Sequence, residues 1–300
     1  MLKLLFVLLA AVILNSSAFS QDCLSRTKEV KPVYSAQIKT LYDKKLAEAF
    51  VEFDKSNGDA DSVIWLGRRT AYLGNYKDAI RLFTRGIGKY PRDARLYRHR
   101  GHRYITRRCF DEAIKDLETA ARLVKGKPDA VEPDGLPNAQ NIPTSTLQSN
   151  IWYHLGLAYY LKGDFKKALA AYQECEKVSK NPDMLVATKH WMYMTLRRLG
   201  DKAAADAAIS DIGDALEIIE NDDYYSLIKL YQGKLKPEVL LTSKGSKTDS
   251  LSNASLGYGI GNWNLYNGRR EEAIKTFEQI TAGDQWSSFG YIAAEADLAR

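Results

Sequence analysis

The sequence predicts an all-α protein, a right-handed superhelical α-solenoid of helix-turn-helix repeats. Three observations predict this fold. Glycine and alanine landmarks recur at fixed intervals, and apolar residues recur every three or four positions. A second glycine interrupts the apolar pattern seven residues after the first. Each repeat is therefore expected to be two helices joined by a tight turn, and stacked repeats bury one continuous core.

The composition is that of an ordinary folded chain. Of its 300 residues, 45% are hydrophobic and 27% are charged, which suffices for a sizeable core. The net charge of +6 permits an anionic partner without requiring one. The sequence has no G-x-S-x-G nucleophile motif, H-E-x-x-H metal motif or phosphate-binding loop. We therefore expect no enzyme activity, no cofactor and no metal.

Residues 1–20 predict a signal peptide. Lys3 precedes the apolar run of residues 4–14, and the small residues Ala18 and Ser20 follow it. The run has about eleven residues, whereas a helix needs roughly 20 to span a bilayer. We expect cleavage after Ser20 and an exported protein, periplasmic or secreted, without an integral membrane span.

Residues 21–59 form the next predicted segment, and they contain a capping helix at 36–54. The apolar residues of this helix fall on one stripe and are expected to cover the exposed end of the first repeat. They are Ile38, Leu41, Leu46, Ala49, Phe50 and Phe53.

Two repeats are predicted over residues 60–127. Gly67 and Gly101 are 34 residues apart, and Gly156 follows Gly101 by 55, one repeat plus 21 residues. The insertion is assigned to residues 128–148. It has four prolines, three acidic residues and no basic ones, so we expect an exposed loop. A further hypothesis is that this acidic loop folds over a basic groove as a removable internal ligand.

The third repeat is predicted at residues 149–182, and weaker repeats follow. Turn glycines at 163, 200, 233 and 268 are spaced close to one repeat apart. Residues 183–253 are therefore assigned to two degenerate repeats. Residues 254–300 are assigned to a last repeat and a C-terminal capping helix.

The pattern resembles the tetratricopeptide repeat family. Residues 149–182 carry the best match, through Trp152, Leu155, Gly156, Tyr159, Ala168, Tyr172 and Pro182. Residues 94–127 depart from it, because Arg100 stands where the pattern has leucine and Arg108 where the turn has glycine. In this family the first helix of each repeat lines the concave face. The resemblance therefore implies a non-catalytic protein–protein interaction scaffold with a peptide groove.

The stretch 95–108, RLYRHRGHRYITRR, holds six arginines and two histidines in the first helix of the second repeat. At 100° per residue, Tyr97, Gly101 and Tyr104 share the side that packs. The opposite arc is expected to point into the groove, joined by residues of the neighbouring first helices. The candidate binding residues are Trp65, Arg68, Tyr72, Arg95, Arg98, His99, His102, Tyr153 and His154.

Guanidinium groups bind carboxylates with two parallel hydrogen bonds, and aromatic rings accept apolar side chains. The expected partner is therefore a protein or peptide that presents an extended acidic segment or a free carboxylate. His99 and His102 are expected to strengthen binding at mildly acidic pH, when both become charged.

Several alternatives stay open. The arginines are also compatible with a solvated face that binds nothing strongly. Nucleic acid is disfavoured, because the basic cluster is confined to one repeat of an exported chain. Zinc bound by His99, His102 and His154 is disfavoured, because the arginines repel a cation. The chain is also compatible with a structural subunit of an envelope complex that uses its convex face or ends, or with an accessory protein of an exported enzyme. The partner's identity and the oligomeric state are not predicted.

The sequence has three cysteines, and they leave the pairing open. A bridge between Cys23 and Cys109 is possible, since both are expected in exposed segments.

Overall fold

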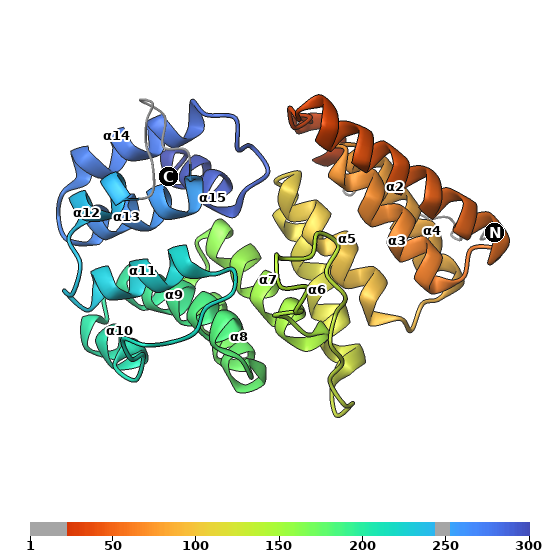
Figure 1. The fold of residues 1–300 in the computed structure, drawn as a ribbon. Helices are drawn as coiled ribbons and strands as arrows, with labels where there is room; N and C mark the ends of the chain where they lie inside the picture. Colours follow the sequence, from red (N-terminus) through yellow and green to blue (C-terminus); the bar gives the residue numbers. More distant parts are fainter. Residues whose placement is uncertain (1–22, 244–252) are drawn as a thin grey trace, which may run out of the picture.

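The computed structural model describes residues 23–243 and 253–300, so the predicted signal peptide lies outside the described residues. The predicted all-α solenoid is confirmed (Figure 1). Helices α2 to α15 have these bounds: Ala36–Lys55, Ala60–Tyr72, Tyr76–Lys89, Ala94–Thr106, Phe110–Val124, Leu147–Lys162, Phe165–Val178, Pro182–Arg198, Lys202–Ile209, Asp222–Tyr231, Pro237–Ser243, Ala254–Tyr266, Arg270–Thr281 and Phe289–Leu298.

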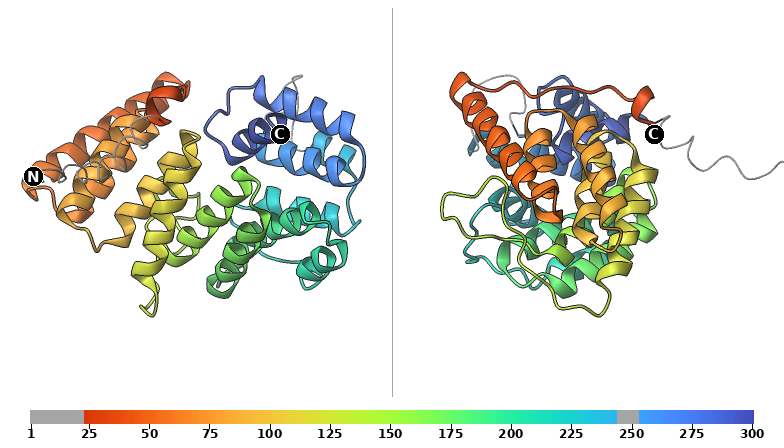
Figure 2. Two further views of the ribbon diagram at one scale, coloured as in Figure 1. Left: turned by 180° about the vertical axis from the view of Figure 1, so that it is seen from behind. Right: turned by 90° about the vertical axis from the view of Figure 1, so that its right-hand side faces the viewer.

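Consecutive helices pack in pairs, and the first helix of each pair also contacts the first helix of the next. The pairs are α3 with α4, α5 with α6, α7 with α8, α9 with α10, and α13 with α14. These contacts join α3 to α5, α5 to α7, and α7 to α9. The pairs follow an arc, with α2 at one end and α14 at the other, while α15 lies inside the arc against α13 and α7 (Figures 1 and 2).

The repeated glycine and aromatic landmarks meet inside each pair. A Cβ atom on Gly67 of α3 would lie 2.5 Å from the Phe83 ring of α4. A Cβ atom on Gly156 of α7 would lie 2.6 Å from the Tyr172 ring of α8. The turn after α7 ends at Gly163 with φ of 81°, a left-handed conformation that favours glycine. The small residue thus sets the approach of the two helices, and the turn glycine lets the chain reverse.

The N-terminal helix α2 covers α3 less completely than its apolar stripe predicts. Ile38, Leu41 and Phe50 are 44%, 48% and 55% exposed, so the prediction is wrong for these residues. Because α3 is the main neighbour of α2 and is shorter, only part of the stripe finds a partner. Leu46 and Phe53 are half-buried.

The segment before α2 is fixed to the second repeat by a disulfide. Cys23 bonds to Cys109, with a Cα–Cα distance of 5.9 Å. Cys109 is 1% exposed, so the expectation that it is exposed was wrong. Arg107 Nη1 adds an ion pair of 2.7 Å to Glu29. Joining residues 86 positions apart restricts the unfolded chain, worth about 4–5 kcal/mol in a chain-entropy model. Cys175 is a free, buried thiol.

The C-terminal helix α15 packs against both α13 and α7. Its Asp297 side chain is 2% exposed and forms an ion pair of 2.9 Å with Arg198 of α9. Tyr258 of α13 donates its hydroxyl to Asp297 at 2.8 Å and lies 2.8 Å from the Tyr160 hydroxyl of α7. One buried polar network therefore joins four helices on the inner side of the solenoid. Within the part of the chain that the structure describes, no helix combines the length and hydrophobicity needed to cross a membrane.

Candidate binding surface

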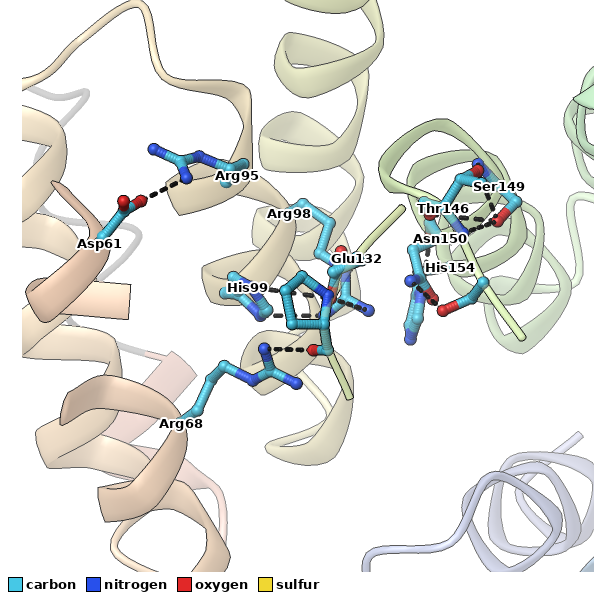
Figure 3. A network of polar contacts seen from close by, with 12 residues as sticks. Asp61, Arg68, Arg95, Arg98, His99, Glu132, Thr146, Ser149, Asn150 and His154 are labelled. Atoms are coloured by element: carbon cyan, nitrogen blue, oxygen red, sulfur yellow. Dashed lines mark hydrogen bonds and ion pairs between the residues drawn. The ribbon is translucent and has the colours of Figure 1, made fainter. Parts of the chain in front are cut away.

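One face of α5 packs against α6, and this packing determines where the side chains on its other face point. Its first turn is capped by Asp93, whose side chain accepts a hydrogen bond from Arg95 N at 3.0 Å. Gly101 lies against Leu117 of α6, and Tyr104 is buried on the same side. Arg98 is thereby directed towards α3 and the 128–148 insertion (Figure 3).

The centre of the predicted groove is covered by the insertion itself. Arg98 Nη2 lies 3.0 Å from Glu132 Oε1, and His99 Nε2 lies 3.7 Å from the same oxygen (Figure 3). Arg98 is 7% exposed and His99 is 5% exposed. The expectation of an open groove at these residues was therefore wrong, because a carboxylate of the same chain occupies it. His99 also stacks on Phe83, with ring centroids 5.7 Å apart.

The neighbouring helix α3 holds the backbone of the insertion. Arg68 Nη1 donates to Pro133 O at 2.8 Å, and Arg69 Nη1 donates to Gly135 O at 2.7 Å. Both guanidinium groups lie over the Trp65 ring, at 4.5 and 4.9 Å from its centroid. A Cβ atom on Gly135 would collide with the Tyr72 hydroxyl, so the loop backbone passes close to this ring.

The insertion has an inner and an outer face, so the prediction of a wholly exposed loop was only partly right. Glu132 and Thr144 are buried, whereas Val131, Leu136 and Ile142 are 63%, 50% and 48% exposed. Asn181 Nδ2 donates to Thr144 O at 2.8 Å and fixes the loop at its far end.

Arg95 does not join this surface. Its guanidinium pairs with Asp93, the N-cap of α5, at 2.6 Å and with Asp61 in the first turn of α3. Figure 3 shows the pair with Asp61. The hydrogen bonds that the guanidinium donates to Asp93 raise the pKa of Arg95 above its ordinary value. The prediction that Arg95 points into the groove was wrong, because two carboxylates near the helix ends hold the long side chain there.

The other predicted residues gather around an aromatic side chain from α15. The rings of His102 and His154 lie 4.3 Å apart, centroid to centroid. Phe289 lies 5.4 Å from His102, 5.5 Å from His154 and 6.2 Å from Tyr153. The C-terminal helix thus covers this part of the inner surface, and Tyr153 and His154 are buried.

The histidines are held in the neutral form. Burial lowers the pKa of His99, His102 and His154 well below the ordinary value, and neighbouring arginines lower it further. Consistently, His99 Nδ1 lies 2.9 Å from Arg98 Nη1, a contact that suits an unprotonated nitrogen. The expected strengthening of binding by histidine protonation is therefore wrong for the covered state.

Sequence reasoning missed three participants. Arg69 and Arg103 each lie next to a predicted residue, Arg68 and His102 respectively. Phe289 had no signal, because nothing in the sequence shows where the C-terminal helix returns.

A cavity of about 110 Å³ lies between α3 and α5. It is lined by Arg68, Ala71, Tyr72, Phe83, Arg98, His99, His102 and Arg103. A larger hollow of about 810 Å³ lies elsewhere, between α6, α7 and α8, where Trp152 and Tyr159 line it.

Comparisons with known proteins identify the repeats. Tetratricopeptide repeat models match residues 66–130 and 149–182. No curated protein matches the sequence. Among solved structures, YrrB, described as a TPR protein with an unusual peptide-binding site, is 15% identical with a TM-score of 0.44, over 83% of this chain and 97% of that one. A tetratricopeptide repeat protein from Parabacteroides merdae is 13% identical with a TM-score of 0.45, over 84% of this chain and 98% of that one.

The matched segments cover α4, α5, α6 and α8 completely, nearly all of α7 and the second half of α3, and these stacked pairs carry the candidate surface. Repeats of this kind are typical of non-catalytic scaffolds for protein–protein interaction. The chain therefore contains tetratricopeptide repeats at residues 66–130 and 149–182, and these repeats support a role as a protein–protein interaction scaffold.

Proposed function

We propose that this protein is an exported, non-catalytic scaffold that binds an extended acidic segment of a partner protein on the inner surface of α3 and α5. Export is supported by the signal-peptide pattern of residues 1–20. The binding residues are Arg68, Arg69 and Arg98, with Trp65 and Tyr72 beside them.

The observation that carries the proposal is the contact of this surface with Glu132. Residues 128–146 of the insertion lie outside any helix, and two kinds of contact hold the insertion against α3 and α5. Arg98 pairs with its carboxylate, while Arg68 donates to the backbone carbonyl of Pro133. This combination suits any extended segment that carries a carboxylate, because backbone carbonyls recur in every peptide.

A partner segment has to displace the insertion. The apparent affinity is then lower than the intrinsic affinity by the fraction of molecules whose surface is uncovered. We therefore propose that the insertion acts as a built-in competitor, and that weakening its hold strengthens partner binding.

The test uses the insertion's own sequence as the ligand. In the variant, a short Gly-Ser turn replaces residues 132–144. A short turn suffices because the two ends of this segment lie close together, joined by the hydrogen bond from Glu132 N to Ser145 O. The probe is a synthetic peptide of residues 129–137, and isothermal titration calorimetry measures binding. Circular dichroism and thermal unfolding verify that the variant folds.

We expect the excised variant to bind the peptide at least tenfold more tightly than the intact chain. A peptide carrying Glu132→Gln should bind the variant at least tenfold more weakly, because it cannot form the charged hydrogen bond. The matched control Arg122→Met removes an exposed arginine of α6 and should leave binding unchanged. Failure of a folded excised variant to bind the peptide would overturn the proposal.

A further inference from the structure

A small cavity between α3 and α5 has an excess of positive charge. Its volume is about 110 Å³, and its lining holds three arginines, Arg68, Arg98 and Arg103. None of the lining residues is acidic, and none belongs to the 128–148 insertion. In the described part of the chain, the one carboxylate in ion-pair contact with these arginines is Glu132, on Arg98.

Two of the arginines have N–H groups that donate no hydrogen bond within the part of the chain that the structure describes. Arg98 Nε is buried and has no hydrogen-bond partner in the described structure. The Arg103 guanidinium lies over the Tyr76 ring, 5.9 Å from its centroid. Burial lowers the pKa of Arg103 to about 10, and the charges of Arg98 and Arg68 add to this effect. Arg103 is half-buried and has no carboxylate in ion-pair contact among the described residues, and a guanidinium withdrawn from water without a counter-ion is costly, so this arrangement is favourable to an anion.

The space fits a small ligand. A water molecule occupies roughly 30 Å³ of liquid volume, so the cavity has room for a few water molecules or one oxyanion of a few heavy atoms. Guanidinium groups match the spacing of oxygen atoms in carboxylates and phosphates, and they donate two parallel hydrogen bonds to them. Tyr72 and His102 offer further hydrogen-bonding groups on the same lining.

We propose that this cavity binds one small oxyanion, a carboxylate or a phosphate, held by Arg103 and Arg98 with Arg68 as a third contact. The site goes beyond the peptide surface proposed above, because its ligand is a free ion and its lining excludes the insertion. The anion neutralises the arginines that Glu132 leaves unpaired and thereby stabilises the packing of α3 on α5.

The experiment uses the intact mature chain with its disulfide formed. Thermal unfolding and calorimetric titration follow the addition of inorganic phosphate and, separately, sodium acetate, at an ionic strength held constant with sodium chloride. The test variant is Arg103→Met, which keeps an apolar stem of similar length and removes the charge. The control variant is Arg122→Met, on the exposed face of α6.

We expect phosphate or acetate to raise Tm in a saturable manner, and the better of the two identifies the oxyanion class. Arg103→Met should lose at least tenfold in affinity and should unfold at a higher Tm than the wild type in chloride alone, because the unpaired charge is gone. That higher Tm also shows that the variant folds. If neither ion acts beyond the chloride baseline, or if the folded variant binds both as tightly as the wild type, the proposal fails. The peptide titration does not depend on this result, so the two proposals can fail separately.

Discussion

Arg100 of α5 holds the buried carboxylate of Asp116 of α6 with two hydrogen bonds of 2.7 Å, from Nε to Oδ2 and from Nη2 to Oδ1. The Asp116 side chain is 5% exposed. Burial raises the pKa of this carboxyl group, and Arg100 opposes the effect. Arg100 stands where the tetratricopeptide pattern has leucine, and this departure from the pattern is compensated by the carboxylate of Asp116 on the facing helix.

Breaking this pair should be costly. Arg100→Leu restores the family residue but leaves a buried carboxylate without a partner, so we expect a loss of about 3–5 kcal/mol in the free energy of unfolding. The double variant Arg100→Leu/Asp116→Leu should recover most of it. Arg81→Leu is the control, because its pair with Asp78 is exposed and worth less than about 1 kcal/mol. Urea unfolding at pH 7 measures all three. A loss below about 1 kcal/mol for Arg100→Leu alone would contradict this account.

The landmark glycine of the first repeat should not tolerate a methyl group. In Gly67→Ala the new Cβ meets the Phe83 ring, which is 1% exposed and cannot move away. Overpacking of this kind costs about 1–3 kcal/mol, against a gain of about 1 kcal/mol in helix propensity. We expect a net loss of stability that Phe83→Leu relieves. Gly88→Ala in α4 is the matched control, since nothing lies within 4 Å of its Cβ. It should gain up to about 1 kcal/mol, and equal effects at the two glycines would refute the packing argument.

The landmark glycines and the arginines of α5 illustrate how far the sequence predicts the fold. The spacing of Gly67 and Gly156 predicts stacked pairs because the closest approach of two helices needs a small residue at a fixed point of each repeat. The position of Arg98 around the helix axis also predicts that its side chain points to the inner surface. The position of Arg95 around the helix axis does not predict its direction, because the carboxylates of Asp61 and Asp93 decide where its long side chain lies.

Two long-range contacts of the candidate surface lie beyond this kind of prediction. Acidity in the insertion suggested a contact with the arginines, but only the fold brings Glu132 within 3.0 Å of Arg98. The return of Phe289 to the inner surface depends on the total curvature of the stacked pairs. That curvature is the sum of many small packing angles, and no local pattern records it.

The buried histidines should make the protein less stable in mild acid. All four histidines of the chain have a lowered pKa in the folded state, and burial brings that of His190 to about 3. The unfolded chain takes up protons near pH 6.5, whereas the folded chain does not, so stability falls as the pH drops below about 6.5. Each histidine that stays neutral contributes about 2 kcal/mol of loss between pH 7 and pH 5.

The His190→Phe variant isolates one of these contributions. His190 is fully buried and stacks on Tyr224, with ring centroids 4.7 Å apart, so a phenyl ring fits the same environment. The variant should lose about 2 kcal/mol less than the wild type between pH 7 and pH 5, as measured by urea unfolding. The comparison is between slopes, because the lost contact with the Tyr231 hydroxyl affects both pH values alike. Stability that stays constant or rises towards pH 5 in the wild type would show that the histidines titrate normally.

Arg108 should control the docking of the C-terminal helix. Its φ of 60° is the left-handed conformation of the turn glycine that the family pattern expects at this position. Its side chain compensates for that strain, since Nε donates to Glu295 at 2.6 Å and Nη2 donates to Trp286 O at 2.9 Å. The guanidinium also lies 3.9 Å from the centroid of the Trp286 ring.

The variant Arg108→Gly separates the backbone from the side chain. Glycine removes about 1–2 kcal/mol of backbone strain, and the lost contacts cost a similar amount, so we expect little change in the global free energy of unfolding. The amides of residues 286–298 should nevertheless exchange with solvent at least tenfold faster, because α15 loses its ion pair with the second repeat and keeps the contact of Phe289 with His102 there. Hydrogen exchange followed by mass spectrometry compares this segment with α5. Arg108→Ala, which loses the contacts and keeps the strain, should be globally less stable than Arg108→Gly by about 1 kcal/mol. Unchanged exchange in α15 would mean that its contacts with α7 and α13 suffice to hold it, and that Arg108 merely accommodates the turn.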